Sequence, residues 1–238
     1  VIFEHLGTNE EETEWAEYRL DEGKGIMLWG NLNGPYSEAA MGWNDNSDFS
    51  WVSYLNRNWT FPSNISYMES HDEERMMYRN LNYGNSSGDY NVHELSTALD
   101  RLELAGAFFF TIPGPKMIWQ FGELGYDYSI EYNGRIGNKP IRWDYFDNAD
   151  RKDVYDTWSD LNLLAVEEPI FETADFSLDV DSSTGLKTIH LTNASVGVDE
   201  IGYVTIVGNF GVVEQEIDPK FQETGVWYEF LANNLKHV

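Results

Sequence analysis

Ionisable side chains follow short apolar runs at three points of the sequence. Glu4 follows residues 1–3, the His71–Asp72 pair ends a run that begins at Asn64, and Glu123 follows residues 117–121. Short buried strands that end in polar groups are typical of a β/α barrel, which carries its chemistry at the carboxyl ends of its strands. If the strands run parallel, we expect all of these side chains to rise from one face.

Carboxyl groups gathered on one rim suit glycoside hydrolysis. That reaction needs one carboxylic acid that gives up a proton and a second carboxylate that stays ionised. The residues alone also allow purely structural roles. The segment from His71 to Arg75 has the composition of a charged first helical turn, and Glu4 could be a helix cap or a surface acid.

Other chemistries find less support in the sequence. The five histidines show no HExxH motif and no paired spacing, so we predict no metal ligands. Ser70, His71 and Asp72 are consecutive and cannot form a triad by themselves, because neighbours in a strand point to opposite faces. No cysteine is present, which excludes disulfides and thiolate chemistry.

The first part of the chain alternates apolar runs with amphipathic segments. Strands are predicted at 1–3, 26–29, 64–68 and 117–121, and helices at about 8–20, 48–56, 92–110 and 151–166. This alternation predicts an α/β fold with short, buried, parallel strands and right-handed crossovers.

From about residue 173 the pattern changes to a period of two. The alternating segments are 176–180, 187–192, 203–207 and 226–230, with Gly, Asn and Ser between them. We therefore predict two domains, an α/β unit at 1–172 and a small antiparallel all-β sandwich at 173–238, complete or truncated.

Composition narrows the classes of partner. The net charge is -26, from 41 acidic and 15 basic residues, which disfavours nucleic acid and anionic membranes. The longest apolar run, residues 105–112, is too short to span a bilayer. Nine Trp and fourteen Tyr suit a neutral polymer with flat faces, although most large aromatics serve the core.

Five stretches together resemble the α-amylase family, glycoside hydrolase family 13. Residues 1–4, Val-Ile-Phe-Glu, resemble the motif after the fifth barrel strand, and 68–72, Met-Glu-Ser-His-Asp, the motif after the seventh. Residues 113–123, Pro-Gly-Pro-Lys-Met-Ile-Trp-Gln-Phe-Gly-Glu, resemble the segment around the eighth strand. Residues 158–169 resemble the last barrel helix, and residues 204–210 resemble the Asn-Phe strand of the following β domain. The sequence as a whole most closely resembles amylase-like proteins of Bacteroidetes type.

The resemblance implies a fold and roles for single residues. The chain would be strands five to eight of a TIM (β/α)8 barrel followed by the small β domain. Glu4 resembles the proton donor that later acts as base, Asp72 the carboxylate that stabilises the transition state, and His71 a sugar-binding histidine. Further candidate sugar contacts near the same rim are Trp29, Asn31, Arg75 and Tyr126.

The family's nucleophile, an Asp two residues beyond an Arg, has no counterpart, since no Gly-x-Arg-x-Asp segment occurs in the chain. A retaining enzyme without its nucleophile loses the covalent step, so we expect the chain alone not to hydrolyse starch. The motif would lie before Val1, as would part of the family's usual calcium site. The chain itself is therefore expected to need no cofactor, and any calcium would be bound by the parent protein.

Three readings follow from the resemblance. The first is part of a retaining enzyme that cleaves α-1,4 linkages in starch or maltodextrin. The second is a branching or transglycosylating relative. The third is a non-catalytic glucan-binding homologue, and the joint presence of Glu4, His71 and Asp72 argues against it.

Half a barrel has two open strand edges, which predicts pairing with the missing N-terminal half or with a second copy. The parent would be secreted or periplasmic if it degrades polysaccharide, although no targeting segment is present to show it.

Overall fold

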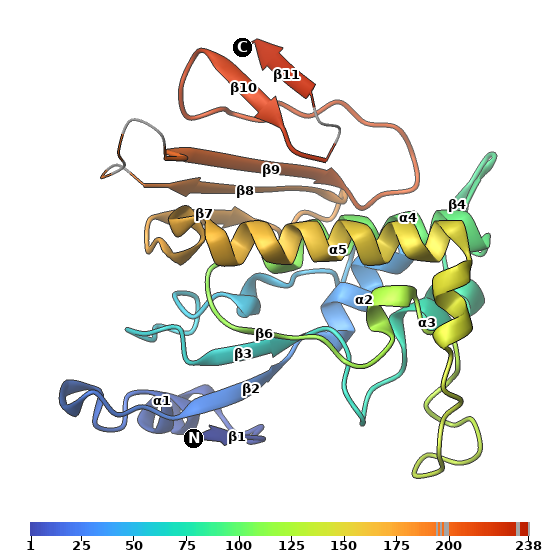
Figure 1. The fold of residues 1–238 in the computed structure, drawn as a ribbon, viewed down its shortest axis with the longest axis horizontal. Helices are drawn as coiled ribbons and strands as arrows, with labels where there is room; N and C mark the ends of the chain where they lie inside the picture. Colours follow the sequence, from blue (N-terminus) through green and yellow to red (C-terminus); the bar gives the residue numbers. More distant parts are fainter. Residues whose placement is uncertain (194, 196, 198–199, 232–233, 238) are drawn as a thin grey trace.

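The computed structural model describes residues 1–193, 195, 197, 200–231 and 234–237. The helices are α1 (Asn9–Ala16), α2 (Asn33–Met41), α3 (Met76–Tyr83), α4 (Leu95–Phe110) and α5 (Ala149–Glu167). The strands are β1 (Ile2–Phe3), β2 (Met27–Asn31), β3 (Asn64–Tyr67), β4 (Ser86–Ser87), β5 (Tyr90–Asn91), β6 (Lys116–Met117), β7 (Phe176–Asp179), β8 (Leu186–Thr192), β9 (Tyr203–Asn209), β10 (Val226–Glu229) and β11 (Asn234–His237). The chain is therefore α/β, with helices α4 and α5 between two sheets (Figure 1).

The first sheet has four strands in the order β1-β2-β3-β6. Each neighbouring pair is parallel, with Phe3 opposite Leu28, Trp29 opposite Ile65 and Tyr67 opposite Met117. The prediction of parallel strands is confirmed, so the segments that follow β1, β2, β3 and β6 leave the sheet at one edge. That these are strands five to eight of a barrel stays a prediction.

Strand β1 departs from the expectation that every strand is buried. Ile2 is 57% exposed and Phe3 is 39% exposed, whereas all four residues of β3 are buried. The reason lies in the sheet order, because β1 is an edge strand with a neighbour on one side only. The edges of the sheet are β1 and β6, which is where the sequence places them.

The expected strand at 117–121 is wrong over most of its length. Pairing stops at Met117, and the backbone amide of Gly122 donates to the carbonyl of Trp119 in a turn. Phe121 adopts a left-handed conformation at φ 63°. The apolar run is therefore a turn that carries Trp119 and Phe121 away from the sheet.

The expected helix at 48–56 is also wrong, because only a short 3-10 turn forms there, at Ser50–Val52. Asp48 accepts a hydrogen bond from the Ser50 amide, and this local turn competes with a helix. Helix α2 was not predicted. It begins after Leu32 despite its Gly34-Pro35 pair, which suits a first turn where amide groups have no helical partner.

The other predicted helices are confirmed with adjusted ends. Helix α1 is capped by Thr8, whose hydroxyl accepts from the Glu11 amide, but α1 ends at Ala16 and not near Leu20. Helices α4 and α5 run close to their predicted bounds. Among the described residues, no helix is both long enough and apolar enough to cross a membrane.

The antiparallel region consists of a three-stranded sheet, β7-β8-β9, and a separate ribbon of β10 and β11. The three-stranded sheet shares one core with the helices, in which Phe108 and Val154 pack in the same cluster as Ile189 and Phe210. The sandwich arrangement and the division at 172 remain predictions, and the last residue of the predicted domain, Val238, lies outside the described residues.

Candidate functional site

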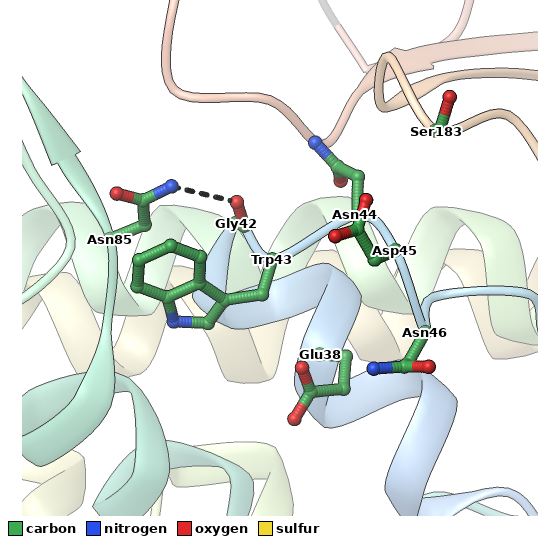
Figure 2. Close-up of a pocket in the computed structure, with 8 residues that line it drawn as sticks. All are labelled: Glu38, Gly42, Trp43, Asn44, Asp45, Asn46, Asn85 and Ser183. Carbon is green, nitrogen blue, oxygen red and sulfur yellow. Dashed lines mark hydrogen bonds between the residues drawn. The ribbon is translucent and has the colours of Figure 1, made fainter.

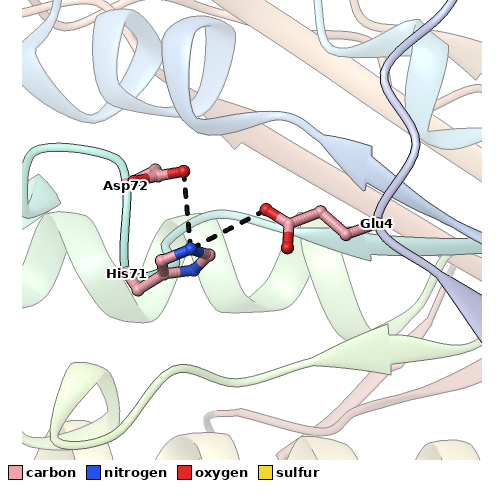
Figure 3. Close-up of side chains that lie close together, drawn as sticks. All are labelled: Glu4, His71 and Asp72. Carbon is pink, nitrogen blue, oxygen red and sulfur yellow. Dashed lines mark ion pairs between the residues drawn. The ribbon is translucent and has the colours of Figure 1, made fainter.

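The carboxyl ends of β1 and β3 bring three predicted side chains together. Glu4 follows β1, and His71 and Asp72 lie in the loop that follows β3 (Figure 3). His71 Nε2 lies 3.8 Å from Glu4 Oε1 and 3.4 Å from Asp72 Oδ2. One polar atom from each side chain falls within 4.8 Å of the others, so the two carboxylates share a single small site.

Two indoles hold the His71 ring between them. The ring of Trp29, on β2, meets it at 6.0 Å in an edge-on arrangement, and Trp119 meets it at 5.9 Å with a tilt of 42°. Trp29 in turn packs edge-on against the buried ring of Tyr67 at 5.4 Å. The predicted residue Trp29 is therefore part of the site, as a wall beside the imidazole.

The loop that carries His71 and Asp72 is fixed by a hydrogen-bonded acid, Glu73. Its carboxylate accepts from the Ser70 hydroxyl and, at 2.6 Å, from the side-chain amide of Asn31. The Ser70 hydroxyl oxygen also accepts from the Asp72 amide at 3.2 Å. The predicted residue Asn31 thus lies at the rim, but its amide group is already engaged in holding this loop.

Arg75 and Tyr126, the other two predicted sugar contacts, are both buried. Arg75 is 2% exposed and donates to the Ser70 carbonyl at 3.0 Å, and Tyr126 is 3% exposed with its hydroxyl on the Pro140 carbonyl. The Arg75 guanidinium lies 5.6 Å from the Tyr126 ring centroid. Both side chains are therefore engaged within the protein, and a sugar contact by either one stays a prediction.

A second acidic pair is formed by Glu69 and Glu123. Glu69 is buried and accepts from the Met76 amide at 2.7 Å; burial raises the pKa of Glu69, while the nearby Arg75 charge acts in the opposite direction. Burial also raises the pKa of Glu123, whose Oε2 is buried without a hydrogen-bond partner among the described residues. Glu123, predicted as a rim acid, is therefore partly buried and separate from the Glu4 cluster.

The three clustered side chains remain open to solvent. Glu4, His71 and Asp72 keep 45%, 47% and 57% of their side-chain surface exposed. An acid, a carboxylate and an imidazole within one sugar-sized space can donate a proton, stabilise positive charge and hydrogen-bond hydroxyl groups. The same spacing would also suit a metal ion, so the expected absence of metal ligands stays a prediction.

Sequence reasoning missed two contributors, Trp119 and Glu73. Trp119 follows β6 just as Glu123 does, so an aromatic residue after a strand end was the available signal. Glu73 was visible only as one acid in a charged run, and its role depends on Asn31, which lies 42 residues away in the chain.

Comparison with known proteins finds similarity at the level of structure. No protein-family model matches the sequence, and no curated protein matches it. Among solved structures, the α-amylase of Geobacillus thermoleovorans complexed with acarbose matches at TM-score 0.59 and 15% identity, over 96% of this chain and 52% of that one. The Anoxybacillus α-amylase matches at TM-score 0.57 and 16% identity, over 97% and 52%. A cyclomaltodextrin glucanotransferase matches at TM-score 0.54 and 14% identity, over 81% and 35%.

The neighbours are members of the α-amylase family, and the chain shares their fold over part of their length. It spans about half of each of the two amylases. The structural matches show the fold. Because the sequence identities are only 14–16%, they do not show the activity, which has to be argued from the site.

Proposed function

We propose that the chain is the C-terminal part of a retaining glycosidase that cleaves α-1,4 linkages in starch or maltodextrin. The observation that carries the proposal is the cluster of Glu4, His71 and Asp72, whose polar atoms lie within 4.8 Å of one another at the end of a parallel sheet. The fold shared with α-amylases and a cyclomaltodextrin glucanotransferase supports it. In this proposal, the four strands of the sheet are strands five to eight of a (β/α)8 barrel.

Each of the three residues takes one role. Glu4 protonates the glycosidic oxygen of the leaving group and later removes a proton from the incoming acceptor. Asp72 stabilises the positive charge that develops at the sugar ring, and His71 donates a hydrogen bond to a sugar hydroxyl. These roles serve the donor sugar alike whether the acceptor is water or a second sugar.

The covalent step needs a nucleophile, and the Gly-x-Arg-x-Asp segment that carries it in the α-amylase family does not occur in this sequence. We propose that the remaining half of the barrel supplies it, together with the residues of any calcium site, and that this chain binds no cofactor of its own. The 238-residue chain by itself should then bind sugar without cleaving it.

The exposed edge strands of the sheet support the proposal that the rest of the barrel lies outside this chain. Val1 is 79% exposed and Ile2 57% on the β1 side, and Ile118 is 43% exposed just after β6. Unpaired strand edges with apolar side chains recruit further strands. We propose that the remaining strands of the parent barrel pair with β1 and β6, and that two copies associate when those strands are missing.

Binding and cleavage by the purified chain test the proposal together. NMR spectra of the His71 ring and of the Trp29 and Trp119 indoles are recorded during titration with acarbose, and reducing-sugar release from maltodextrin is measured in parallel. We expect saturable shifts of all three rings and no cleavage. The shifts should weaken in Asp72→Ala and persist in Asp89→Ala, which changes an exposed acid of the β4–β5 hairpin.

Two results would contradict the proposal. Clear reducing-sugar release by the chain alone would show that it carries a complete catalytic apparatus. Acarbose shifts confined to residues away from His71 would show that the cluster is not a sugar site.

A further inference from the structure

Away from the rim, two hollows open on the outer side of helices α2 and α3. One encloses about 400 Å³ beside the loop that follows α2, and Figure 2 shows its lining, with Glu38 on the helix and Trp43, Asp45, Asn46 and Asn85 around it. The other encloses about 570 Å³ between α2 and α3. Glu38 and Trp43 line both hollows, so the two meet at this indole.

Trp43 is exposed and yet held in place. Its side chain is 45% exposed, while its indole N–H donates to the Tyr83 carbonyl at 2.8 Å. Asn85 braces the same loop, since its side-chain amide donates to the Gly42 carbonyl at 3.0 Å. An aromatic face held this way costs little conformational entropy when a ligand packs against it.

Three polar groups of the groove differ in kind and remain uncommitted, whereas the Ser129 hydroxyl at its far end donates to Glu74 at 2.7 Å. The Glu38 carboxylate, the Tyr78 hydroxyl and the Arg79 guanidinium make no hydrogen bond or ion pair with any residue in the described part of the chain. A carboxylate accepts, a guanidinium donates and a phenol does both. Such a mixture fits a ligand with many hydroxyl groups, because each hydroxyl also donates and accepts.

Charge excludes an anionic ligand here. Glu38, Asp45, Glu74 and Glu131 line the two hollows against the single base Arg79, in a chain of net charge -26. Phosphate and carboxylate ligands would be repelled. The lining is mainly polar, with aromatic surface from Trp43, Tyr78 and Tyr83, and both volumes fall in the size range of small-molecule sites.

We propose that this groove is a second carbohydrate site, which binds a neutral oligosaccharide against Trp43, outside the Glu4–His71–Asp72 cluster. That the oligosaccharide is an α-glucan rests on the proposed function; that it is a neutral carbohydrate rests on the groove alone. One end of the groove reaches Glu74, two residues beyond Asp72 in the chain. A glucan held there lies on the same loop that carries the rim site, which raises the local concentration of substrate.

The indole N–H signals of the ¹⁵N-labelled 238-residue chain report on both sites in one titration with maltotriose. We expect the Trp43 signal to shift with saturation, in the wild type and in the double variant Glu4→Gln/Asp72→Asn. Trp43→Ala removes the reporting indole, so its affinity for maltotriose is read from the backbone amide signals of Glu38 and Arg79, and we expect it to be about tenfold weaker or more. Trp51→Ala is the matched control, because Trp51 is 43% exposed and lies outside the groove, and it should leave affinity within about twofold.

The outcomes separate the two proposals. A silent Trp43 signal with shifts at Trp29 and Trp119 overturns the groove site and supports the rim. Shifts at Trp43 alone support the groove and overturn sugar binding at the rim, and silence at all three overturns both. If Trp43→Ala does not fold, Arg79→Gln replaces it, and an unchanged maltotriose affinity in that variant together with a silent Trp43 in the wild type overturns the groove.

Discussion

Two regions of the molecule treat their polar groups in opposite ways. At the seam between the helices and the sheet β7-β8-β9, Arg101 and Lys187 are at most 2% exposed, and each gives its hydrogen bonds to backbone carbonyls. At the rim, Glu4, His71 and Asp72 are about half exposed, and within the described part of the chain their charged groups pair only with one another. The seam is complete within this chain, and the rim is open.

The aromatic residues follow the same division. Phe49, Phe108 and Phe210 are fully buried and contact one another edge-on across the seam, at 5.2 to 6.1 Å. Trp29 and Trp119 instead flank an exposed imidazole. Stability should therefore reside in the seam and ligand binding at the rim, and substitutions in the two regions should separate the two properties.

Arg101→Met should produce the largest loss of stability. The guanidinium donates five hydrogen bonds, to the carbonyls of Ala39 and Ala40 near the end of α2 and to those of Asn209, Phe210 and Gly211 at the end of β9 and just after it. Leaving these buried carbonyls without a donor should lower the free energy of unfolding by about 3–5 kcal/mol, measured by urea denaturation.

The matched control for that variant is Arg19→Met, whose guanidinium forms an exposed ion pair with Glu22. It should change the free energy of unfolding by less than about 0.5 kcal/mol. Equal effects of the two substitutions would show that Arg101 does not tie the layers together.

Lys187→Met should cost less, about 1–3 kcal/mol in the free energy of unfolding. The ammonium donates to the carbonyls of Ser47 and Val180 and lies 4.9 Å from the Phe49 ring centroid, so both carbonyls lose their donor while the apolar stem is kept. If Lys187→Met has the same free energy of unfolding as the wild type, the aromatic residues alone stabilise the seam.

The same lysine predicts a pH dependence. Burial lowers the pKa of Lys187 to about 8, below its ordinary value of 10.5. Between these two values the unfolded chain binds more protons than the folded one, so the stability of the wild type relative to Lys187→Met should rise as pH increases from about 8 to about 10.5. Urea denaturation of both proteins across this range measures the difference, and a fall would show the opposite shift.

Substitutions at the rim should have the smallest effect on stability. Glu4→Gln and Asp72→Asn keep the shape of exposed side chains, so each should change the free energy of unfolding by less than about 0.5 kcal/mol. If either substitution lowers the free energy of unfolding as much as Lys187→Met does, the Glu4–His71–Asp72 cluster stabilises the fold. The rim and the seam would then not differ in their contribution to stability.

Much of this division could be predicted from local patterns, and some of it could not. The strand ends place Glu4 and Asp72 on one rim because parallel strands end at the same edge, and the long periodic helices α4 and α5 follow from their apolar spacing. Helix α2 was missed because its Gly34-Pro35 pair resembles a turn.

Two remaining differences have separate causes. Arg75 was predicted as a sugar contact near the rim, but its side chain is buried, beside the carboxylate of Glu69 and the ring faces of Trp119 and Tyr126. The turn at Phe121 depends on a left-handed backbone conformation that an apolar run does not reveal. A tertiary contact decided the first case and a local backbone conformation decided the second.

The most direct test of the central claim is the response of the His71 ring to acarbose in the chain with and without its two carboxylates. The account predicts a saturable shift of the His71 ring signals in the wild type, which is strongly weakened in Glu4→Gln/Asp72→Asn while that variant unfolds at the same urea concentration. A His71 ring that ignores acarbose in the wild type, or that responds equally in the double variant, would contradict the claim that these three residues form one sugar site.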